Sequence, residues 1–175
     1  MAKTLWILAA VFALTAGITD FRYRKIPNWL TYPAIPIAIL LHWIIAGGHA
    51  ALLSLGGAAV GLGVLLPFVL LGALGGGDWK LMGALGAFFE PRRLVPVLIL
   101  TLMINGIMAL VLVLWKKRIG QTARNVGRIT AALFKFRAPG ADLSIDNPEG
   151  EKVPFGIAAA IATLLYVAAQ RWMAF

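Results

Sequence analysis

The sequence predicts an all-α, polytopic membrane protein with about six transmembrane helices. Hydrophobic residues make up 61% of the 175 positions and charged residues only 13%, and the mean hydropathy is +0.87. Soluble domains are about half apolar and about a quarter charged, so a soluble chain of this size could not bury so much apolar surface. The apolar residues also gather in stretches near the ~20 residues that span a bilayer. We expect one transmembrane domain over residues 1–175.

Six apolar segments can be followed along the chain. They are Leu5–Thr19, Trp29–Ile45, Ala50–Leu74, Trp79–Phe89, Leu94–Trp115 and Pro154–Trp172. The first loosely resembles a secretory signal peptide, but we expect it to be retained as a span. Pro33 and Pro36 should bend the second near its start. In the third, Gly57 and Gly61 form a G-x-x-x-G pair that allows another helix to approach closely.

The fourth segment is the shortest of the six. Residues 79–89 give about 17 Å of helix, against a bilayer core of ~30 Å. It could be a full crossing, a half-span, a re-entrant piece or a helix extended through Arg93. The charge distribution favours a crossing, because with six spans twelve of the sixteen Lys and Arg residues fall on one side of the membrane. The positive-inside rule then places those twelve in the cytoplasm and both termini outside.

The largest segment between spans is basic and covers residues 116–152. Apolar residues recur in it at three- and four-residue steps from Ile119 to Phe136, while Arg124 and Arg128 fall on another face. This pattern predicts an amphipathic helix on the cytoplasmic leaflet, attracted to anionic lipids. A solvated basic linker is the alternative. Residues 138–151 are rich in Pro and Gly and are predicted to be a loop.

Several classes of site are excluded by composition. The chain has no cysteine, which removes disulfides, thiolate metal sites and thiol catalysis. Its two histidines, His42 and His49, are too few for most metal sites. Ser54 lacks a surrounding nucleophile motif, and no nucleotide-binding fingerprint is present. We therefore expect no metal and no cofactor. The net charge of +9 is explained by membrane sidedness rather than by binding to nucleic acid.

Two acidic residues stand out from the seven in the chain. Asp20 and Asp78 each lie where an apolar segment meets the membrane surface, and six spans place both on the cytoplasmic side. A carboxylate at this depth is costly and is a candidate for function. An ion pair with Arg22 or Lys80 is the structural alternative. The other acids, Glu90 in a turn included, need no explanation beyond solvation.

Two carboxylates that lie close together can share the work of hydrolysis. They cannot both ionise easily, so one keeps a proton while the other is charged. The charged group can take a proton from water as the water attacks a peptide carbonyl, and the protonated group can donate to the leaving nitrogen. Before Asp78, the run Gly75–Gly77 would permit unusual backbone conformations and leave room for a substrate strand, although it equally fits a helix-breaking turn.

Three sequence blocks resemble the type IV prepilin peptidases, whose second aspartate lies in a GxGD motif. The blocks are D-F-R-Y-R-K-I-P-N-W-L-T from Asp20, G-G-G-D-W-K-L-M-G-A-L-G from Gly75 and V-P-F-G-I-A from Val153. The resemblance implies an aspartic protease with Asp20 and Asp78 as its catalytic pair, facing the cytoplasm of the inner (plasma) membrane. It would remove the short basic leader of pilin-like precursors, whose apolar helix could pack against Gly57 and Gly61. The supporting residues carried over from the three blocks are Arg22, Ile26, Pro27, Asn28, Gly75, Gly77, Lys80, Pro154, Phe155 and Gly156. Of these, Pro27 and Asn28 are expected to start the second helix, and Pro154–Gly156 the last.

The chain departs from the longer members of that family. It has no cysteine-rich domain and no insertion between its first two spans, so we expect peptidase activity without N-methylation. It most resembles the small peptidases of tight-adherence (Flp-type) pilus systems, with archaeal preflagellin peptidases as the alternative. An ion- or proton-coupled transporter and an inactive helper of pilus assembly also remain open. The expected partners are pilin-like precursors and anionic lipids, and the oligomeric state is open.

Overall fold

A computed structural model describes residues 2–70, 72, 74–116 and 153–172, and every element in these ranges is an α-helix. The elements are α1 (Ala2–Tyr23), α2 (Asn28–Ala46), α3 (Gly48–Leu70), α4 (Gly76–Trp115) and α6 (Phe155–Trp172). The predicted all-α class is confirmed. The predicted amphipathic helix and loop of residues 116–152 lie outside the described residues, apart from Lys116 at the end of α4.

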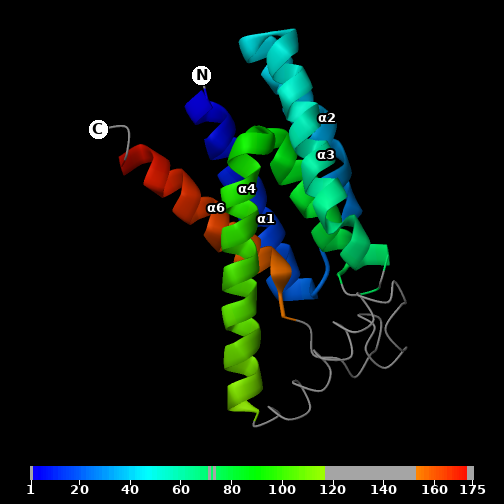
Figure 1. The fold of residues 1–175 in the computed structure, drawn as a ribbon, viewed down its shortest axis with the longest axis vertical. Helices are drawn as coiled ribbons and strands as arrows, with labels where there is room; N and C mark the ends of the chain where they lie inside the picture. Colours follow the sequence, from blue (N-terminus) through cyan, green and yellow to red (C-terminus); the bar gives the residue numbers. More distant parts are fainter. Residues whose placement is uncertain (1, 71, 73, 117–152, 173–175) are drawn as a thin grey trace.

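The helices form a bundle, and most of them run roughly along its long axis (Figure 1). In the part of the chain that the structure describes, four helical stretches are long and apolar enough to cross a membrane, namely Thr4–Tyr23, Asn28–Ala46, Gly48–Leu70 and Gly76–Trp115. A shorter apolar helix covers Phe155–Gln170. The protein is therefore a multi-pass membrane protein by the length and composition of its helices, and the count of six crossings stays a prediction.

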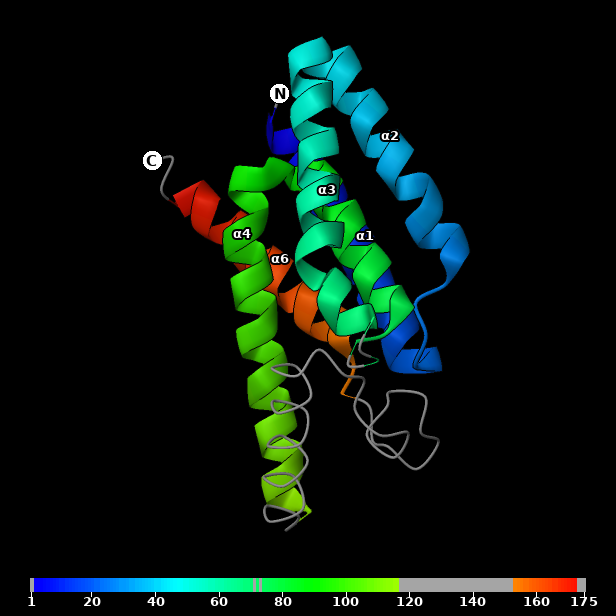
Figure 2. The same ribbon diagram turned by 45° about the vertical axis from the view of Figure 1, so that its right-hand side comes forward.

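The helix α4 consists of two limbs joined at Glu90. This residue has φ 63° and ψ 165°, which is not helical, and the chain reverses direction there (Figure 2). Pro91 follows, and a proline favours the extended ψ found at the residue before it. The limbs, residues 76–89 and 91–115, correspond to the fourth and fifth apolar segments of the sequence. A fourth helix extended through Arg93 is therefore ruled out.

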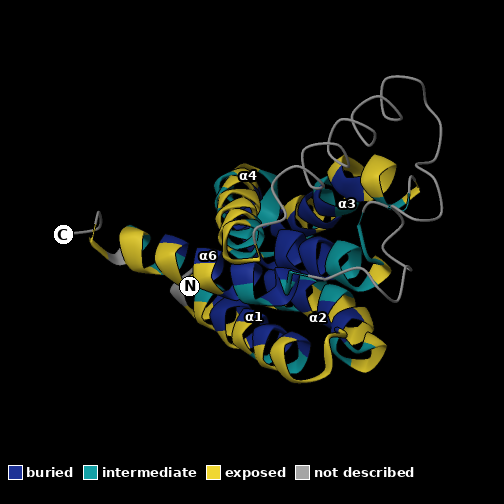
Figure 3. Ribbon diagram, turned by 90° about the horizontal axis from the view of Figure 1, so that it is seen from below, coloured by how far each residue is buried: buried dark blue, intermediate teal, exposed yellow. Residues whose placement is uncertain are grey.

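The first limb of α4 is the centre of the bundle. Every residue from Leu81 to Phe89 is buried. The ring of Phe88 packs on Phe12 of α1 at 5.7 Å between centroids, and the ring of Phe89 packs edge-on against Tyr166 of α6 at 5.5 Å. Buried residues face the middle of the bundle and exposed ones face outward (Figure 3). Because many of the exposed side chains are large and apolar, they suit a lipid environment.

The two glycines of the G-x-x-x-G pair lie against this central limb. A Cβ atom at Gly57 would overlap the Gly86 carbonyl oxygen and lie 2.8 Å from the Cα of Glu90. One at Gly61 would overlap the Met82 carbonyl oxygen. The predicted close approach of a helix is confirmed. Its partner is α4 of the same chain, so the idea that a precursor helix packs on this face is wrong.

Candidate active site

Asp20 lies in the last turn of α1 and is almost fully buried, with 6% of its surface exposed. The helix continues beyond the apolar segment, to Tyr23, and Arg24 then takes a left-handed conformation with φ 53°. The Arg24 main-chain N–H donates to the Asp20 carbonyl oxygen at 2.8 Å, which satisfies one of the last carbonyls of the helix. Arg22, in the same turn, is exposed.

The start of α6 covers the Asp20 side chain. The main-chain N–H of Gly156 donates a buried hydrogen bond to Asp20 Oδ2 at 2.7 Å. This N–H is available because the first turn of a helix has no carbonyl partners for its amides. A Cβ at Gly156 would lie 2.8 Å from the Cβ of Asp20 and 3.1 Å from the Ala16 carbonyl oxygen, so only glycine fits. Pro154 immediately precedes the helix and Phe155 is buried as its first residue.

Asp78 occupies the first turn of α4, three residues after Gly75 at the N-cap. The positive end of the helix dipole favours a carboxylate at this position. A Cβ at Gly75 would lie only 3.0 Å from Asp78 Oδ2, so the carboxylate lies back over this glycine. Gly75 itself has ordinary extended angles, φ −70° and ψ 143°. The predicted unusual backbone conformation is therefore wrong for Gly75, and the space that this glycine leaves is taken by the Asp78 carboxylate.

The connection between α1 and α2 contacts the first turn of α4 directly. A Cβ at Gly77 would lie 3.3 Å from the Cβ of Ile26, which is buried. The next residue, Pro27, has extended angles as the N-cap of α2, and its carbonyl oxygen accepts from the Leu30 N–H at 3.1 Å. The prediction that Pro27 and Asn28 start the second helix is thus confirmed. The absence of a side chain at Gly77 lets the two aspartate motifs pack together.

Lys80 makes a second link between the two motifs. Its Nζ donates to Asn28 Oδ1 at 3.0 Å and lies 4.6 Å from the ring centroid of Tyr32, a cation–π contact. Next to it, the Trp79 indole N–H donates to the Leu62 carbonyl oxygen of α3 at 2.6 Å. The turn of α4 that carries Asp78 is therefore held by both α2 and α3.

All three sequence blocks meet at one end of the bundle, where α1 ends and α2, α4 and α6 begin (Figure 1). Gly156 joins the third block to the first, and Gly77 and Lys80 join the second to the first. Within the described residues, no group of three or more His, Asp or Glu side chains could hold a metal ion. Asp20 in the last turn of α1 and Asp78 in the first turn of α4 bring carboxyl groups to this end, which suits acid–base chemistry.

The sequence interpretation missed a polar cluster beside the reversal of α4. Glu90 was expected to be solvated, but its side chain is only 18% exposed and contacts both His42 and Arg93. The i,i+3 spacing of Glu90 and Arg93 was a signal for their ion pair. The only sequence feature that pointed to the contact between His42 and Glu90 was the presence of a single ionisable residue, His42, in an apolar helix.

Residues 7–114 match the Type IV leader peptidase family, which is more than half of the chain. The chain belongs to this family. It is thus a peptidase whose substrates are precursor proteins. The matched range contains both aspartate motifs and ends before the third block at residues 153–158. Comparison with curated proteins found no significant match, and comparison with solved structures also found none.

Proposed function

We propose that this leader peptidase is an aspartic endopeptidase of the GxGD type and that Asp20 and Asp78 are its catalytic pair. The observation that carries the proposal is the direct packing of the two aspartate motifs, through Gly77 against Ile26 and Lys80 on Asn28. Such packing supports a shared site because Gly77 and Lys80 lie on either side of Asp78, and their contacts Ile26 and Asn28 belong to the same sequence block as Asp20.

The two carboxyl groups would divide the chemistry of one hydrolysis. One, ionised, takes a proton from the attacking water, and the other, protonated, donates to the peptide nitrogen that leaves. The attack forms a bond between the water oxygen and the peptide carbon, and the C–N bond then breaks. The hydrogen bond from Gly156 restrains one oxygen of Asp20 and so helps to orient its carboxyl group for this task.

The substrates that we propose are pilin-like precursors, cut after their short basic leader at the cytoplasmic face of the inner membrane. Arg22, Arg24 and Lys25 lie within five residues of Asp20, and Lys80 lies two residues after Asp78, which supports a cytoplasmic orientation of the aspartates by the positive-inside rule. We further propose that the product keeps a free, unmethylated N-terminus.

The test is cleavage of a co-expressed pilin-like precursor by Asp20→Asn and Asp78→Asn. Each substitution keeps the size of the side chain and removes its acid–base function, so we expect normal insertion and a loss of cleavage of at least about a hundredfold. Asp146→Asn, outside all three blocks, is the matched control. The mass of the product reports both the position of the cut and the absence of a methyl group.

Substantial cleavage by either variant would reject the catalytic pair. The parent protein should also cleave in the presence of a chelator. Loss of cleavage on chelation, with recovery on adding metal back, would indicate a metalloenzyme instead. Ion or proton flux that depends on both aspartates, in a protein that cleaves no precursor, would support the transporter alternative.

A further inference from the structure

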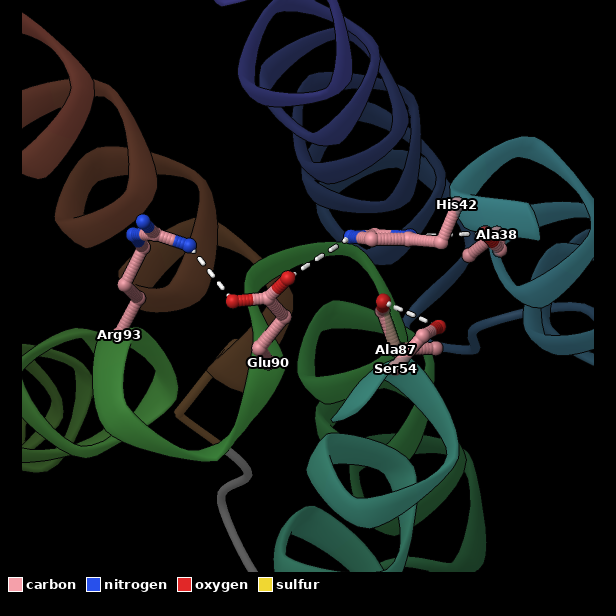
Figure 4. A network of polar contacts seen from close by, with 6 residues as sticks. All are labelled: Ala38, His42, Ser54, Ala87, Glu90 and Arg93. Atoms are coloured by element: carbon pink, nitrogen blue, oxygen red, sulfur yellow. Dashed lines mark hydrogen bonds and ion pairs between the residues drawn. The ribbon is translucent and has the colours of Figure 1, made fainter. Parts of the chain in front are cut away.

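The polar cluster beside Glu90 joins α2 and α3 to the reversal of α4 (Figure 4). Glu90 has two partners: His42 Nε2 lies 3.6 Å from its Oε1, and Arg93 Nη1 lies 2.6 Å from its Oε2. The other ring nitrogen of His42, Nδ1, lies 2.9 Å from the Ala38 carbonyl oxygen. Ser54 Oγ donates to the Ala87 carbonyl oxygen at 2.7 Å. His42 and Ala38 belong to α2, Ser54 to α3, and the others to α4. The cluster lies at the opposite end of the first limb of α4 from Asp78.

The end of the first limb needs partners for its main-chain carbonyls. A helix leaves its last four carbonyl groups without partners, and Pro91 has no N–H to offer. Ser54 donates to one of them, that of Ala87, and is itself fully buried. Ser54 therefore fastens the end of this limb to α3, one turn from the close contact between Gly57 and Gly86.

The backbone of Glu90 has a positive φ of 63°, which residues other than glycine rarely adopt. Each of its two carboxylate oxygens contacts a basic side chain. The guanidinium of Arg93 contacts one oxygen and also lies 5.6 Å from the ring of Trp6 on α1. The other oxygen faces His42. Because His42 Nδ1 must donate to the Ala38 carbonyl, the contact with Nε2 is an ion pair when the ring carries a second proton. The strained turn is thus held from both sides.

We propose that His42, Ser54, Glu90 and Arg93 form a clamp that positions Asp78 from the far end of the first limb of α4. This inference rests on the proposed function. Residues 76–89 are one rigid helical segment of about 20 Å, so fixing its end fixes the depth and rotation of its first turn. These four are positioning residues, because their contacts lie at the Glu90 end of the limb and they would act on Asp78 only through the helix.

The test measures the spacing of the two aspartate-bearing helices directly. The chain has no cysteine, so spin labels can be attached at Ile18→Cys and Gly76→Cys, each two residues from an aspartate. Ile18 is 62% exposed, and a Cβ at Gly76 would meet nothing within 4 Å. Electron paramagnetic resonance in proteoliposomes then gives the distribution of distances between the labels, with no need for catalysis.

Two variants remove the clamp in different ways. Glu90→Gly permits the positive φ while deleting the carboxylate, and His42→Phe keeps an aromatic ring while deleting both polar contacts. We expect each to broaden the distance distribution and to lower kcat on the order of tenfold with little change in KM. Arg92→Gln is the matched control in the same turn, since Arg92 makes none of the contacts above, and it should behave as the parent.

A parent-like distance distribution in Glu90→Gly would overturn the clamp. If Glu90→Gly fails to accumulate in the membrane, the same result in His42→Phe decides the question. The distance measurement stands even if the parent cleaves no precursor, so failure of the clamp is distinguishable from failure of the proposed peptidase activity.

Discussion

The main-chain N–H of Gly156 donates a hydrogen bond to Asp20 Oδ2 at 2.7 Å, although 136 positions separate the two residues in the sequence. The contact places the first turn of α6 on the last turn of α1 and keeps the carboxyl group away from solvent. It also gives the third sequence block a physical role, because the space beside Asp20 is too small for any residue but glycine at position 156.

Gly156→Ala is therefore predicted to damage both stability and the site. The new methyl group would lie 2.8 Å from the Cβ of Asp20 and must displace α6 or the aspartate. We expect a loss of stability of about 1–3 kcal/mol and a large loss of cleavage, measured by thermal unfolding in detergent and by precursor processing. At Gly48, a Cβ would meet open space, so Gly48→Ala is the matched control. Normal cleavage by Gly156→Ala would show that this close contact does not set the geometry of Asp20.

A second prediction concerns the link between Lys80 and Asn28. Lys80→Met removes the hydrogen bond to Asn28 and the cation–π contact with Tyr32 but keeps an unbranched side chain. We expect cleavage to fall by about threefold to tenfold, because the link positions the helix of Asp78 and performs no chemistry.

The double variant Lys80→Met with Asn28→Ala separates this link from independent effects. If the two residues act through their hydrogen bond, the double variant loses less activity than the product of the two single losses. Fully multiplicative losses would argue against a functional link between the pair.

The glycines of α3 give a prediction about stability alone. Gly61 packs against the Met82 main chain, whereas a Cβ at Gly63, two residues on, would meet open space. We expect Gly61→Ala to destabilise the protein by about 1–3 kcal/mol and Gly63→Ala to be neutral or stabilising by up to about 1 kcal/mol. Thermal unfolding in detergent measures both. Equal stabilities for the two variants would contradict the packing of α3 on α4.

Much of the helical framework could be predicted because hydropathy is a local property of the sequence. The apolar segments of residues 5–19, 29–45 and 154–172 each correspond to one observed helix, with ends that differ by a few residues. The turn predicted at Glu90, between the fourth and fifth apolar segments, is also confirmed. The fourth apolar segment left its path ambiguous, because about 17 Å of helix suits a full or a partial crossing.

The contacts that organise the site were less accessible to sequence reasoning. The spacing of Gly57 and Gly61 predicted a close helix contact, but nothing local identifies Gly86 and Met82 as its other side. The pairing of His42 with Glu90 joins residues on different helices, and such a pair follows from how the helices pack. The sequence predicted Glu90 to be a solvated turn residue because it does not show that His42 of α2 faces this turn.

The central claim is that Asp20 and Asp78 meet, and cross-linking of cysteines in native membranes tests it most directly. The chain contains no cysteine, so Asp20→Cys with Asp78→Cys gives a single pair of thiols for a short bifunctional reagent. Ile26→Cys with Gly77→Cys is the positive control, since the Cβ positions lie 3.3 Å apart, close to the separation found in disulfides. We predict that both pairs form an intramolecular link, detected by mass spectrometry. A link in the control pair but none between positions 20 and 78 would contradict the account.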